Sequence, residues 1–164
     1  MFCCYSQENT VIFKAYGTFK LLSVERDKKS RRKHDLEESL NAILDTDFLL
    51  FCAENRIDYA SEFSRLYPEN LQLSIVDKTL DELEHFAARG GKSAALVKLV
   101  KTILRLKNVS VITTSKQGIV DDLIVSLANT NSVVATQDLG LKRRLRLKGT
   151  QIVTVRKKSH LLIE

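Results

Sequence analysis

The feature of this chain that most constrains its fold is a regular alternation of short apolar runs with segments of helical periodicity. Five runs have the length of a strand, and they are 40–44, 71–76, 109–113, 133–136 and 152–155. Between them, apolar residues recur at helical spacing in 48–55, 59–66, 80–87, 93–106, 121–128 and 139–147. Strands that alternate with helices form parallel sheets covered by helices on both faces. We therefore predict an α/β fold with three α/β/α layers and a central, mainly parallel sheet of five strands.

The 164 residues divide into a globular part and an N-terminal extension. Residues 40–164 carry the alternating pattern, and a segment of this length can bury a core of its own. Residues 1–39 are less regular: 11–24 alternates in part and could form a hairpin, and 28–33 is the basic run KKSRRK. That run is either a solvated arm or a contact for phosphates. We predict a domain at 40–164 preceded by an extension at 1–39.

Composition bounds the class of protein. Hydrophobic residues make up 44% of the chain, and one Pro and six Gly leave little room for linkers. No apolar run approaches the roughly 20 residues of a membrane span, and the N-terminus lacks the order of a signal peptide. Cys3, Cys4 and Cys52 are odd in number and have no metal-ligand spacing. We expect reduced thiols, a cytoplasmic location and no association with a membrane.

Acidic and basic residues are concentrated in different parts of the chain. Residues 35–84 contain thirteen acidic and three basic residues, a net charge of −10. Residues 138–158 contain eight basic residues and one acidic residue, a net charge of +7, and 20–33 adds seven basic residues against two acidic ones. This separation suits a metal site beside a surface for a polyanion. A solvated surface with no partner is the alternative, because a pI of about 9.3 fits both.

Acidic residues stand at equivalent places after four of the predicted strands. Asp45 follows the first strand, Glu82 lies in the helix after the second, Asp121 and Asp122 begin the helix after the third, and Asp138 follows the fourth. In a parallel sheet the carboxyl ends of the strands meet at one edge. These carboxylates are therefore expected close together.

Each of these acids has a simpler interpretation as a helix cap. Asp45, Asp121 and Asp138 can each cap the helix that follows. Thr79 and Glu82 fit a capping box, with Thr79 as N-cap and Glu82 three residues later. Taken together, the capping interpretations are less favoured than each one alone. Four carboxylates at one edge of the sheet would repel one another unless a cation neutralised them. Oxygen ligands with no His or Cys nearby in sequence favour Mg²⁺ or Mn²⁺ over Zn²⁺.

Four sequence motifs together resemble the acidic motifs of PIN-domain ribonucleases. They are LDTDFL at 44–49, DELE at 81–84, VDDLI at 120–124 and VATQD at 134–138. The segment from 141–145 to 153–156 is similar to an archaeal branch of that family, related to nucleases of ribosomal-RNA processing and to VapC-like toxins. The resemblance covers about residues 40–160. Each motif alone is weak, but the four occur in order with strands between them.

The resemblance implies which residues form the site. The catalytic, metal-binding acids would be Asp45, Glu82, Asp121 and Asp138, with Asp122 as a further metal-binding acid and Thr46 and Thr136 in support. The sequence departs from the family pattern at two positions, where Asp47 and Gln137 each replace a common Asn.

The resemblance also implies the activity and the partners. One or two Mg²⁺ or Mn²⁺ ions would assist hydrolysis of RNA phosphodiester bonds by an endonucleolytic cut, in ribosomal-RNA processing or RNA decay. From their position after Asp138 on a predicted helix, Lys142, Arg143, Arg144 and Arg146 could hold the RNA backbone. Arg143 and Arg146 share one face of that helix, with Leu141, Leu145 and the stem of Arg144 on the buried side. The expected partners are RNA, either single-stranded or structured, an antitoxin or a ribosome-assembly protein, and a second copy of the chain.

Three other functions compete with this interpretation. A VapC-like toxin of a toxin–antitoxin pair would use the same chemistry, and a non-catalytic PIN-like scaffold would bind RNA without cutting it. Asp45-Thr46-Asp47 also fits the DxD opening of haloacid-dehalogenase phosphatases. Only five residues separate Ser115 from Asp121, however, which is too few for the lysine motif and the strand that this phosphatase family places between them.

Overall fold

The computed structural model describes residues 40–68, 71–115 and 118–164. The predicted extension at 1–39, with its hairpin and basic run, lies outside the described residues. Within the described part, no helix has the length and apolar character needed to cross a membrane.

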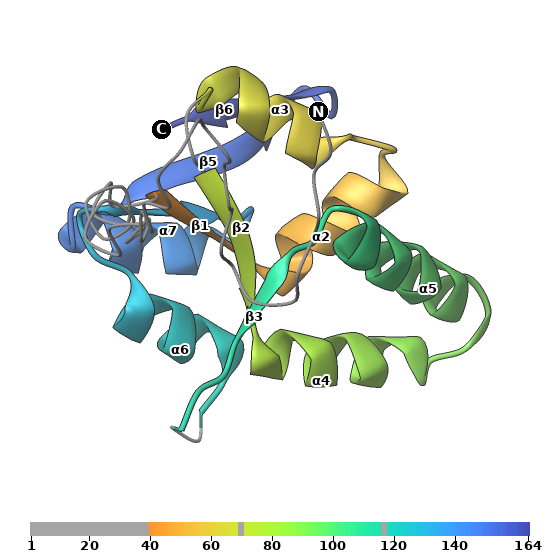
Figure 1. The fold of residues 1–164 in the computed structure, drawn as a ribbon. Coiled ribbons are helices and arrows are strands. Elements are labelled where there is room, and N and C mark those ends of the chain that lie inside the picture. Colours follow the sequence, from red (N-terminus) through yellow and green to blue (C-terminus); the bar gives the residue numbers. More distant parts are fainter. Residues whose placement is uncertain (1–39, 69–70, 116–117) are drawn as a thin grey trace, which may run out of the picture. The chain divides into compact units, whose positions relative to one another are not determined.

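A six-stranded sheet forms the centre of the described domain (Figure 1). The strands are β1 (Leu40–Leu44), β2 (Leu71–Val76), β3 (Ser110–Ile112), β4 (Ser132–Ala135), β5 (Gln151–Arg156) and β6 (His160–Ile163). Their order across the sheet is β3-β2-β1-β4-β5-β6, and every neighbouring pair is parallel except β5 and β6. The predicted parallel α/β sheet is confirmed, with six strands in place of five.

Six helices connect these strands in the described part of the chain. They are α2 (Thr46–Glu54), α3 (Tyr59–Leu66), α4 (Asp77–Ala87), α5 (Gly91–Leu106), α6 (Val120–Leu127) and α7 (Leu139–Leu147). All six were predicted from helical spacing, and α3 and α7 have the predicted bounds. Each connection between parallel strands contains a helix, as parallel pairing requires.

Two apolar clusters lie on opposite faces of the sheet, and β1 contributes residues to both. Ala42 and Leu44 belong to one cluster and Ile43 to the other, because successive side chains of a strand point to opposite faces. The first cluster contains residues of α2, α3, α4 and α5, and the second contains residues of α6 and α7. The one polar residue of β1, Asn41, is partly buried, and its Oδ1 accepts a hydrogen bond of 2.7 Å from Ser74 Oγ of β2.

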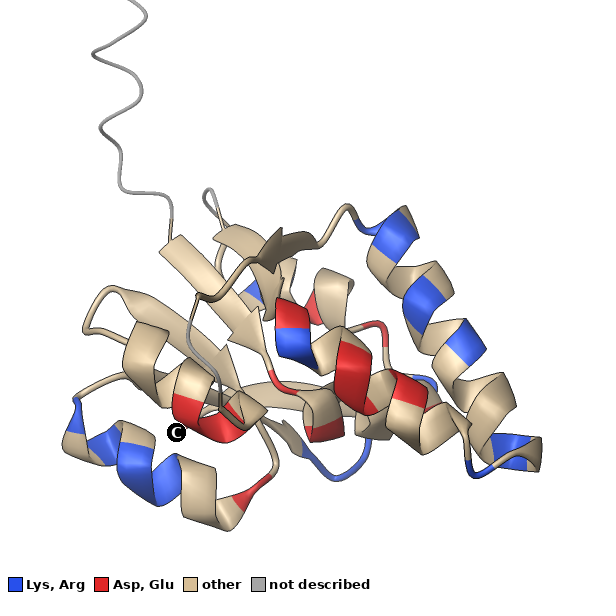
Figure 2. Ribbon diagram, turned by 90° about the horizontal axis from the view of Figure 1, so that it is seen from below, with Lys and Arg blue, Asp and Glu red and all other residues tan. Residues whose placement is uncertain are grey.

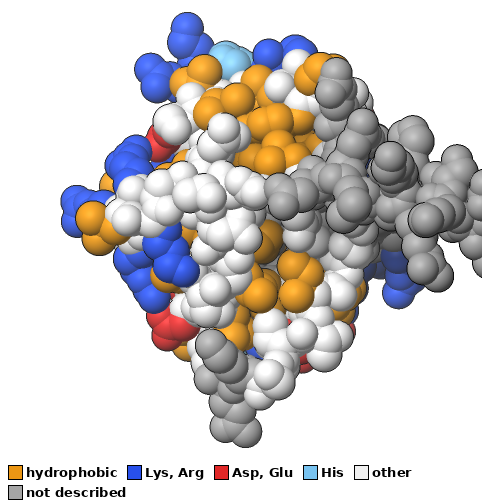
Figure 3. Space-filling view, turned by 60° about the vertical axis from the view of Figure 1, so that its left-hand side comes forward, with side chains coloured by type: hydrophobic (Ala, Val, Ile, Leu, Met, Phe, Trp, Pro, Cys, Tyr) orange, Lys and Arg blue, Asp and Glu red, His pale blue; other side chains and the backbone are white. Residues whose placement is uncertain are grey.

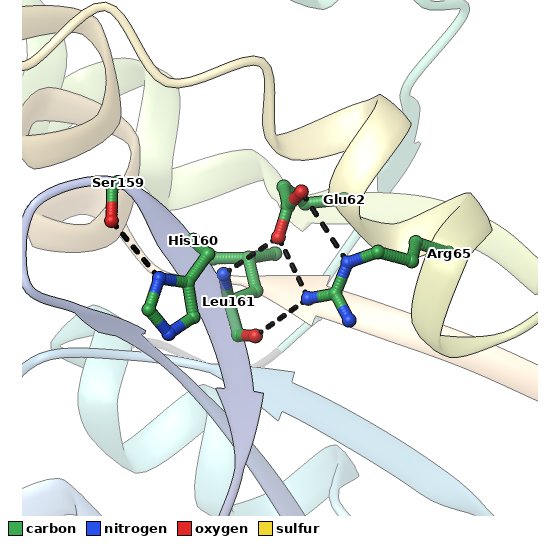
Figure 4. A network of polar contacts seen from close by, with 5 residues as sticks. All are labelled: Glu62, Arg65, Ser159, His160 and Leu161. Carbon is green, nitrogen blue, oxygen red and sulfur yellow. Dashed lines mark hydrogen bonds and ion pairs between the residues drawn. The ribbon is translucent and has the colours of Figure 1, made fainter.

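The sixth strand was missing from the sequence-based prediction. It returns antiparallel to β5 after a turn in which Lys157 and Lys158 have positive φ angles. Figure 4 shows how α3 covers its outer edge: the Leu161 N–H donates to Glu62 Oε2 over 2.9 Å, and Arg65 Nη2 donates to the Leu161 carbonyl over 2.9 Å. These side chains satisfy backbone groups that an edge strand otherwise leaves unpaired.

The predicted capping box at Thr79 and Glu82 is wrong. Helix α4 begins directly after β2, at Asp77, so Thr79 lies inside its first turn. The Thr79 side chain is buried, and its hydroxyl has no hydrogen-bond partner among the described residues. The earlier start follows from Asp77, whose carboxylate accepts hydrogen bonds from the backbone N–H groups of Lys78 and Thr114. The carboxylate of Glu82 is therefore not used as a cap.

Candidate functional site

The acids predicted to form the site follow the carboxyl ends of neighbouring parallel strands. Asp45 comes directly after β1, and Asp138 follows β4, which pairs with β1. Glu82 lies in the helix after β2, the other neighbour of β1, and Asp121 lies in the first turn of α6, after β3. Figure 2 shows acidic residues (red) grouped on these segments, with Lys and Arg (blue) along α5 and α7.

Asp45 is a buried carboxyl group held by a hydroxyl. Only 4% of the residue is exposed, and its Oδ2 accepts a hydrogen bond of 2.7 Å from Thr136 Oγ1. The pKa of Asp45 is raised to about 7, mainly by burial; the hydrogen bond from Thr136 lowers it, and the charges of Asp121 and Asp47 add to the rise. Ionisation of Asp45 is therefore unfavourable in the folded protein, both because the group is buried and because other carboxylates are near.

Thr46, the residue after Asp45, forms a hydrogen bond with Glu82. Thr46 Oγ1 donates a hydrogen bond of 2.5 Å to Glu82 Oε2, across 36 residues of sequence. Thr46 is itself buried, at the first position of α2, next to Asp45. Consecutive residues after β1 thus carry one proposed metal-binding acid and bind a second.

Asp121 and Asp138 are coupled by charge. Burial and the negative charge of Asp138 raise the pKa of Asp121, Asp47 and Asp122 add to that effect, and Arg144 opposes it. Since Asp121 also raises the pKa of Asp45, electrostatic coupling connects three of the four predicted acids, and the Thr46 hydrogen bond connects the fourth. The convergence of all four carboxylates on one site stays a prediction.

The capping interpretations have different outcomes at the three positions. Asp138 is the N-cap of α7, and its Oδ1 accepts a hydrogen bond of 2.6 Å from the Leu141 N–H. Asp45 occupies the N-cap position of α2, but its side chain makes no capping hydrogen bond. The N-cap of α6 is Ile119, so Asp121 does not have that role. Capping therefore accounts for Asp138 alone.

The donor set fits a hard divalent cation in its chemistry. All four groups are carboxylates, the ligands that Mg²⁺ and Mn²⁺ prefer, and their mutual repulsion favours a cation between them. In the described part of the chain, no three Asp, Glu, His or Cys side chains are arranged so that they could hold a metal ion together. Hydrogen bonds from Thr136, Thr46 and the Leu141 N–H occupy oxygens of three of the carboxylates instead.

Asp77 was not singled out from the sequence, although it follows β2 as directly as Asp45 follows β1. Its two carboxylate oxygens accept hydrogen bonds from the Thr114 N–H over 2.9 Å and from Thr114 Oγ1 over 2.7 Å. These bonds lower the pKa of Asp77. They tie the chain after β3 to the end of β2, and the position directly after a strand was the signal that could have drawn attention to it.

The basic residues of α7 face different sides of the helix. Lys142 is buried, and both Lys142 and Arg146 form ion pairs with Glu164, over 3.0 Å and 2.5 Å. Arg144 pairs with Asp122 over 2.6 Å, and its side chain is 43% exposed, in contrast to the buried stem that was expected. Arg143 is exposed and has no ion-pair partner among the described residues. The burial of Lys142 is unfavourable to its predicted contact with RNA.

Basic and hydrophobic side chains lie side by side on part of the surface. Figure 3 shows a face on which Lys and Arg side chains gather along one side and hydrophobic side chains are exposed beside them. The exposed hydrophobic residues of the described chain include Ile119 and Leu139, which precede α6 and begin α7. The surroundings of the proposed acids are thus partly apolar.

Comparisons with known proteins agree on the fold. The family model described as "PIN like domain" matches residues 42–158, which confirms the resemblance seen in the motifs. The PIN domain endonuclease Utp24 is similar in structure, with a TM-score of 0.63, 24% sequence identity, and coverage of 77% of this chain and 92% of that one. No functionally curated protein matches the chain.

Two further solved structures share the fold at lower identity. One is VapBC2 from Rickettsia felis bound to a DNA fragment from its promoter, with a TM-score of 0.53, 16% identity, and coverage of 70% of this chain and 98% of that one. The other is a domain of a functionally unknown protein from Methanocaldococcus jannaschii, with a TM-score of 0.50, 16% identity, and coverage of 71% and 91%.

Proposed function

This chain belongs to the PIN-like domain family, and from that premise we propose that it is a metal-dependent endoribonuclease. The observation that supports the proposal is that Asp45, Asp121 and Asp138 interact through their charges, while the hydroxyl of Thr46, next to Asp45, binds Glu82. Ligand sites of open α/β sheets lie at the carboxyl ends of the strands. The likeness to Utp24, a PIN domain endonuclease, agrees with this assignment.

The four carboxylates would hold one or two Mg²⁺ or Mn²⁺ ions, with Asp122 as a further candidate. A bound divalent ion supplies an activated water and stabilises the charge on the leaving oxygen of a phosphodiester. Thr136 orients Asp45 through Oδ2, and its hydroxyl oxygen also accepts the Asp138 N–H over 3.0 Å. One threonine therefore fixes the positions of two acids that follow adjacent strands.

Thr46 has the corresponding role for Glu82. Its hydroxyl holds one oxygen of the Glu82 carboxylate and leaves the other oxygen without a described hydrogen-bond partner. Hydrogen bonds of this kind, made to a carboxylate by a neighbouring side chain, set its orientation toward a bound metal ion. We assign Thr46 and Thr136 as the positioning residues of the site.

RNA is the proposed substrate, and ribosomal RNA is the first to test. The basic residues Arg143 and Arg146 lie on the exposed surface of α7, which begins next to Asp138, and would contact the RNA backbone. Contacts of this kind position a substrate and read little sequence. Lys142, which is buried against Glu164, would support the helix instead.

The proposal extends to the assembly of the protein. We propose a homodimer and a protein partner of either the antitoxin or the ribosome-assembly kind, since VapBC2 and Utp24 share the fold. Light scattering during size-exclusion chromatography measures the mass in solution, and a mass of one chain at all concentrations would contradict the dimer.

The test of the proposed function is cleavage of RNA by purified full-length protein in Mg²⁺, in Mn²⁺ and in EDTA. We expect internal cuts with either metal, none in EDTA, and none with Asp45→Asn in any condition. Hydrolysis of para-nitrophenyl phosphate without RNA cleavage would indicate phosphatase chemistry. RNA binding without cleavage in either metal would identify a scaffold and overturn the proposal.

A further inference from the structure

Of the basic residues on α7, Arg144 is directed toward the proposed acids. Successive residues of a helix differ by about 100°, so Lys142 and Arg146 share one side and Arg144 lies about 160–200° away from both. The ion pairs agree with this geometry, because Lys142 and Arg146 both bind Glu164 whereas Arg144 binds Asp122 on α6. Arg144 therefore extends toward α6, the helix that also carries Asp121.

We propose that Arg144 binds the phosphate of the substrate beside the acidic site, and that Asp122 is the residue that positions its guanidinium. This inference rests on the proposed ribonuclease function and gives that function a further substrate-binding residue. It also gives Asp122 a role different from the metal ligand suggested by the family resemblance.

In its ion pair with Asp122, Arg144 still has N–H groups that can bind a second anion. Arg144 Nη2 donates to Asp122 Oδ1 over 2.6 Å, and the two side chains are 43% and 56% exposed. A guanidinium has five N–H donors in a rigid fork, so one nitrogen bound to a carboxylate leaves others for the oxygens of a phosphate. An ion pair as exposed as this one contributes little to stability, so breaking it should not by itself unfold the protein.

The charge of Arg144 acts on the site itself. Among the groups that influence Asp121, Arg144 lowers its pKa while Asp138, Asp47 and Asp122 raise it. Arg144 is thus a basic group whose charge reaches a carboxylate proposed to bind metal. A fixed cation beside those carboxylates would attract a phosphodiester in addition to the proposed metal ions. Arginine suits this position because it binds phosphate oxygens with two parallel hydrogen bonds.

The carboxylate of Asp122 is already bound to Arg144. Its Oδ1 is bound to Arg144, and the side chain is more exposed than that of its partner. Asp121, the preceding residue, is the partly buried acid that is coupled to Asp45 and Asp138. The two consecutive acids therefore have different roles: Asp121 belongs to the proposed metal-binding acids, and Asp122 holds Arg144.

The experiment compares Arg144→Ala, Arg144→Lys, Asp122→Asn and the double variant Arg144→Ala/Asp122→Asn in the full chain. The matched control is Arg105→Ala, an exposed arginine near the end of α5, where the chain approaches the amino end of β3. Two quantities are measured for each protein: kcat/KM for cleavage of a single-stranded RNA, and the Mg²⁺ concentration that gives half of the metal-induced rise in Tm.

We expect Arg144→Ala to lower kcat/KM by at least about 10-fold, the effect of losing one charge-assisted hydrogen bond. Arg144→Lys should recover part of that loss because it restores the charge without the fork. Asp122→Asn should cause a smaller loss by itself and none in the Arg144→Ala background, since it acts through the arginine. The Mg²⁺ midpoint should stay unchanged in Arg144→Lys, which keeps the positive charge beside Asp121, and in Asp122→Asn, whose carboxylate is proposed to hold the arginine and not the metal.

Failure of this inference and failure of the proposed function would give different results. If the wild-type protein cleaves RNA and Arg144→Ala behaves like Arg105→Ala, the inference fails and the proposed function stands. If Asp122→Asn shifts the Mg²⁺ midpoint or lowers kcat/KM further in the Arg144→Ala background, Asp122 is a metal ligand and its assigned role is wrong. A wild-type protein that does not cleave RNA overturns the proposed function and this inference together.

Discussion

Thr136, which follows β4, donates a hydrogen bond of 2.7 Å to the buried carboxylate of Asp45, which follows β1, across 91 residues of sequence. The parallel pairing of β1 with β4 places these residues side by side, with Leu44 opposite Ala135 in the register. The bond favours the ionised form of Asp45, whereas burial favours the neutral form. The balance between these effects leads to the first two predictions.

Replacing Asp45 by Asn should stabilise the metal-free protein at alkaline pH. The pKa of Asp45 is about 7 in the folded state and 3.8 as an ordinary aspartate. A raised folded pKa contributes stability that is complete below about 3.8 and is lost as the pH rises through about 7. At pH 8 the variant should therefore be more stable than wild type by up to about 4 kcal/mol, since each tenfold change in proton affinity is worth about 1.4 kcal/mol.

Urea unfolding at pH 4 and pH 8 in EDTA measures this difference. The advantage of Asp45→Asn should be much smaller at pH 4, where the wild-type carboxyl group is protonated in the folded state. An equal difference at both pH values would show that ionisation of Asp45 does not oppose folding.

Replacing Thr136 by Val should destabilise the protein by about 1–3 kcal/mol, because the Asp45 carboxylate loses its hydroxyl donor and the Asp138 N–H loses its acceptor. Thr136→Ser keeps the hydroxyl and is the matched control. Both are measured by urea unfolding at pH 8. If Thr136→Ser were as destabilised as Thr136→Val, packing of the methyl group would account for the effect.

Glu82→Gln should abolish most of the cleavage with little loss of stability. Gln still offers an oxygen to the Thr46 hydroxyl but lacks the charge that would bind a cation. We expect activity to fall by at least about 100-fold, more than is usually lost when a residue that only orients a metal ligand is changed. The rise in Tm on adding Mg²⁺ should also be smaller.

Glu84→Gln is the control for this prediction. Glu84 lies on the same helix, is exposed, and pairs with Lys101 of α5. Activity and Mg²⁺ response close to wild type are expected for this variant. A Glu82→Gln protein with the same profile would remove Glu82 from the proposed site.

The pair Arg143→Ala/Arg146→Ala should weaken RNA binding and reduce its dependence on salt. Each contact to a single-stranded phosphate contributes about 0.7 to the slope of log affinity against log salt, so the slope should fall by about 1.4. Stability should change by less than about 1 kcal/mol, since Arg146 forms only an exposed pair with Glu164. Binding is measured by fluorescence anisotropy in EDTA, which prevents metal-dependent cleavage.

Lys98→Ala/Arg105→Ala removes the same amount of charge from exposed positions on α5, a helix that carries none of the proposed acids. If both double variants reduced the slope equally, RNA would be attracted by net charge and not by a surface on α7.

Local sequence patterns determined most of the secondary structure. The predicted ranges 71–76, 59–66 and 139–147 are the observed bounds of β2, α3 and α7. Apolar runs of strand length and helical spacing are properties of neighbouring residues, so they can be read without knowing the fold. The strand ends identified the acids for the same reason, because parallel pairing places every carboxyl end at one edge.

The starts of elements and the partners of side chains depended on tertiary structure. Thr79 fits a capping box with Glu82, yet Asp77 begins the helix because its carboxylate is tied to Thr114, 37 residues away. The last strand was missed because its edge is satisfied by Glu62 and Arg65 of α3, and no local pattern reports such a contact.

The same limit applies to the site. That Asp45, Glu82, Asp121 and Asp138 are acids after strands was evident from the sequence. That Thr136 and Thr46 hold Asp45 and Glu82, and that Arg144 turns to Asp122 while Lys142 and Arg146 turn to Glu164, was decided by the fold. A hydrogen bond or ion pair needs its two groups within about 3 Å, and only the packing of helices against the sheet brings residues so distant in sequence to that separation.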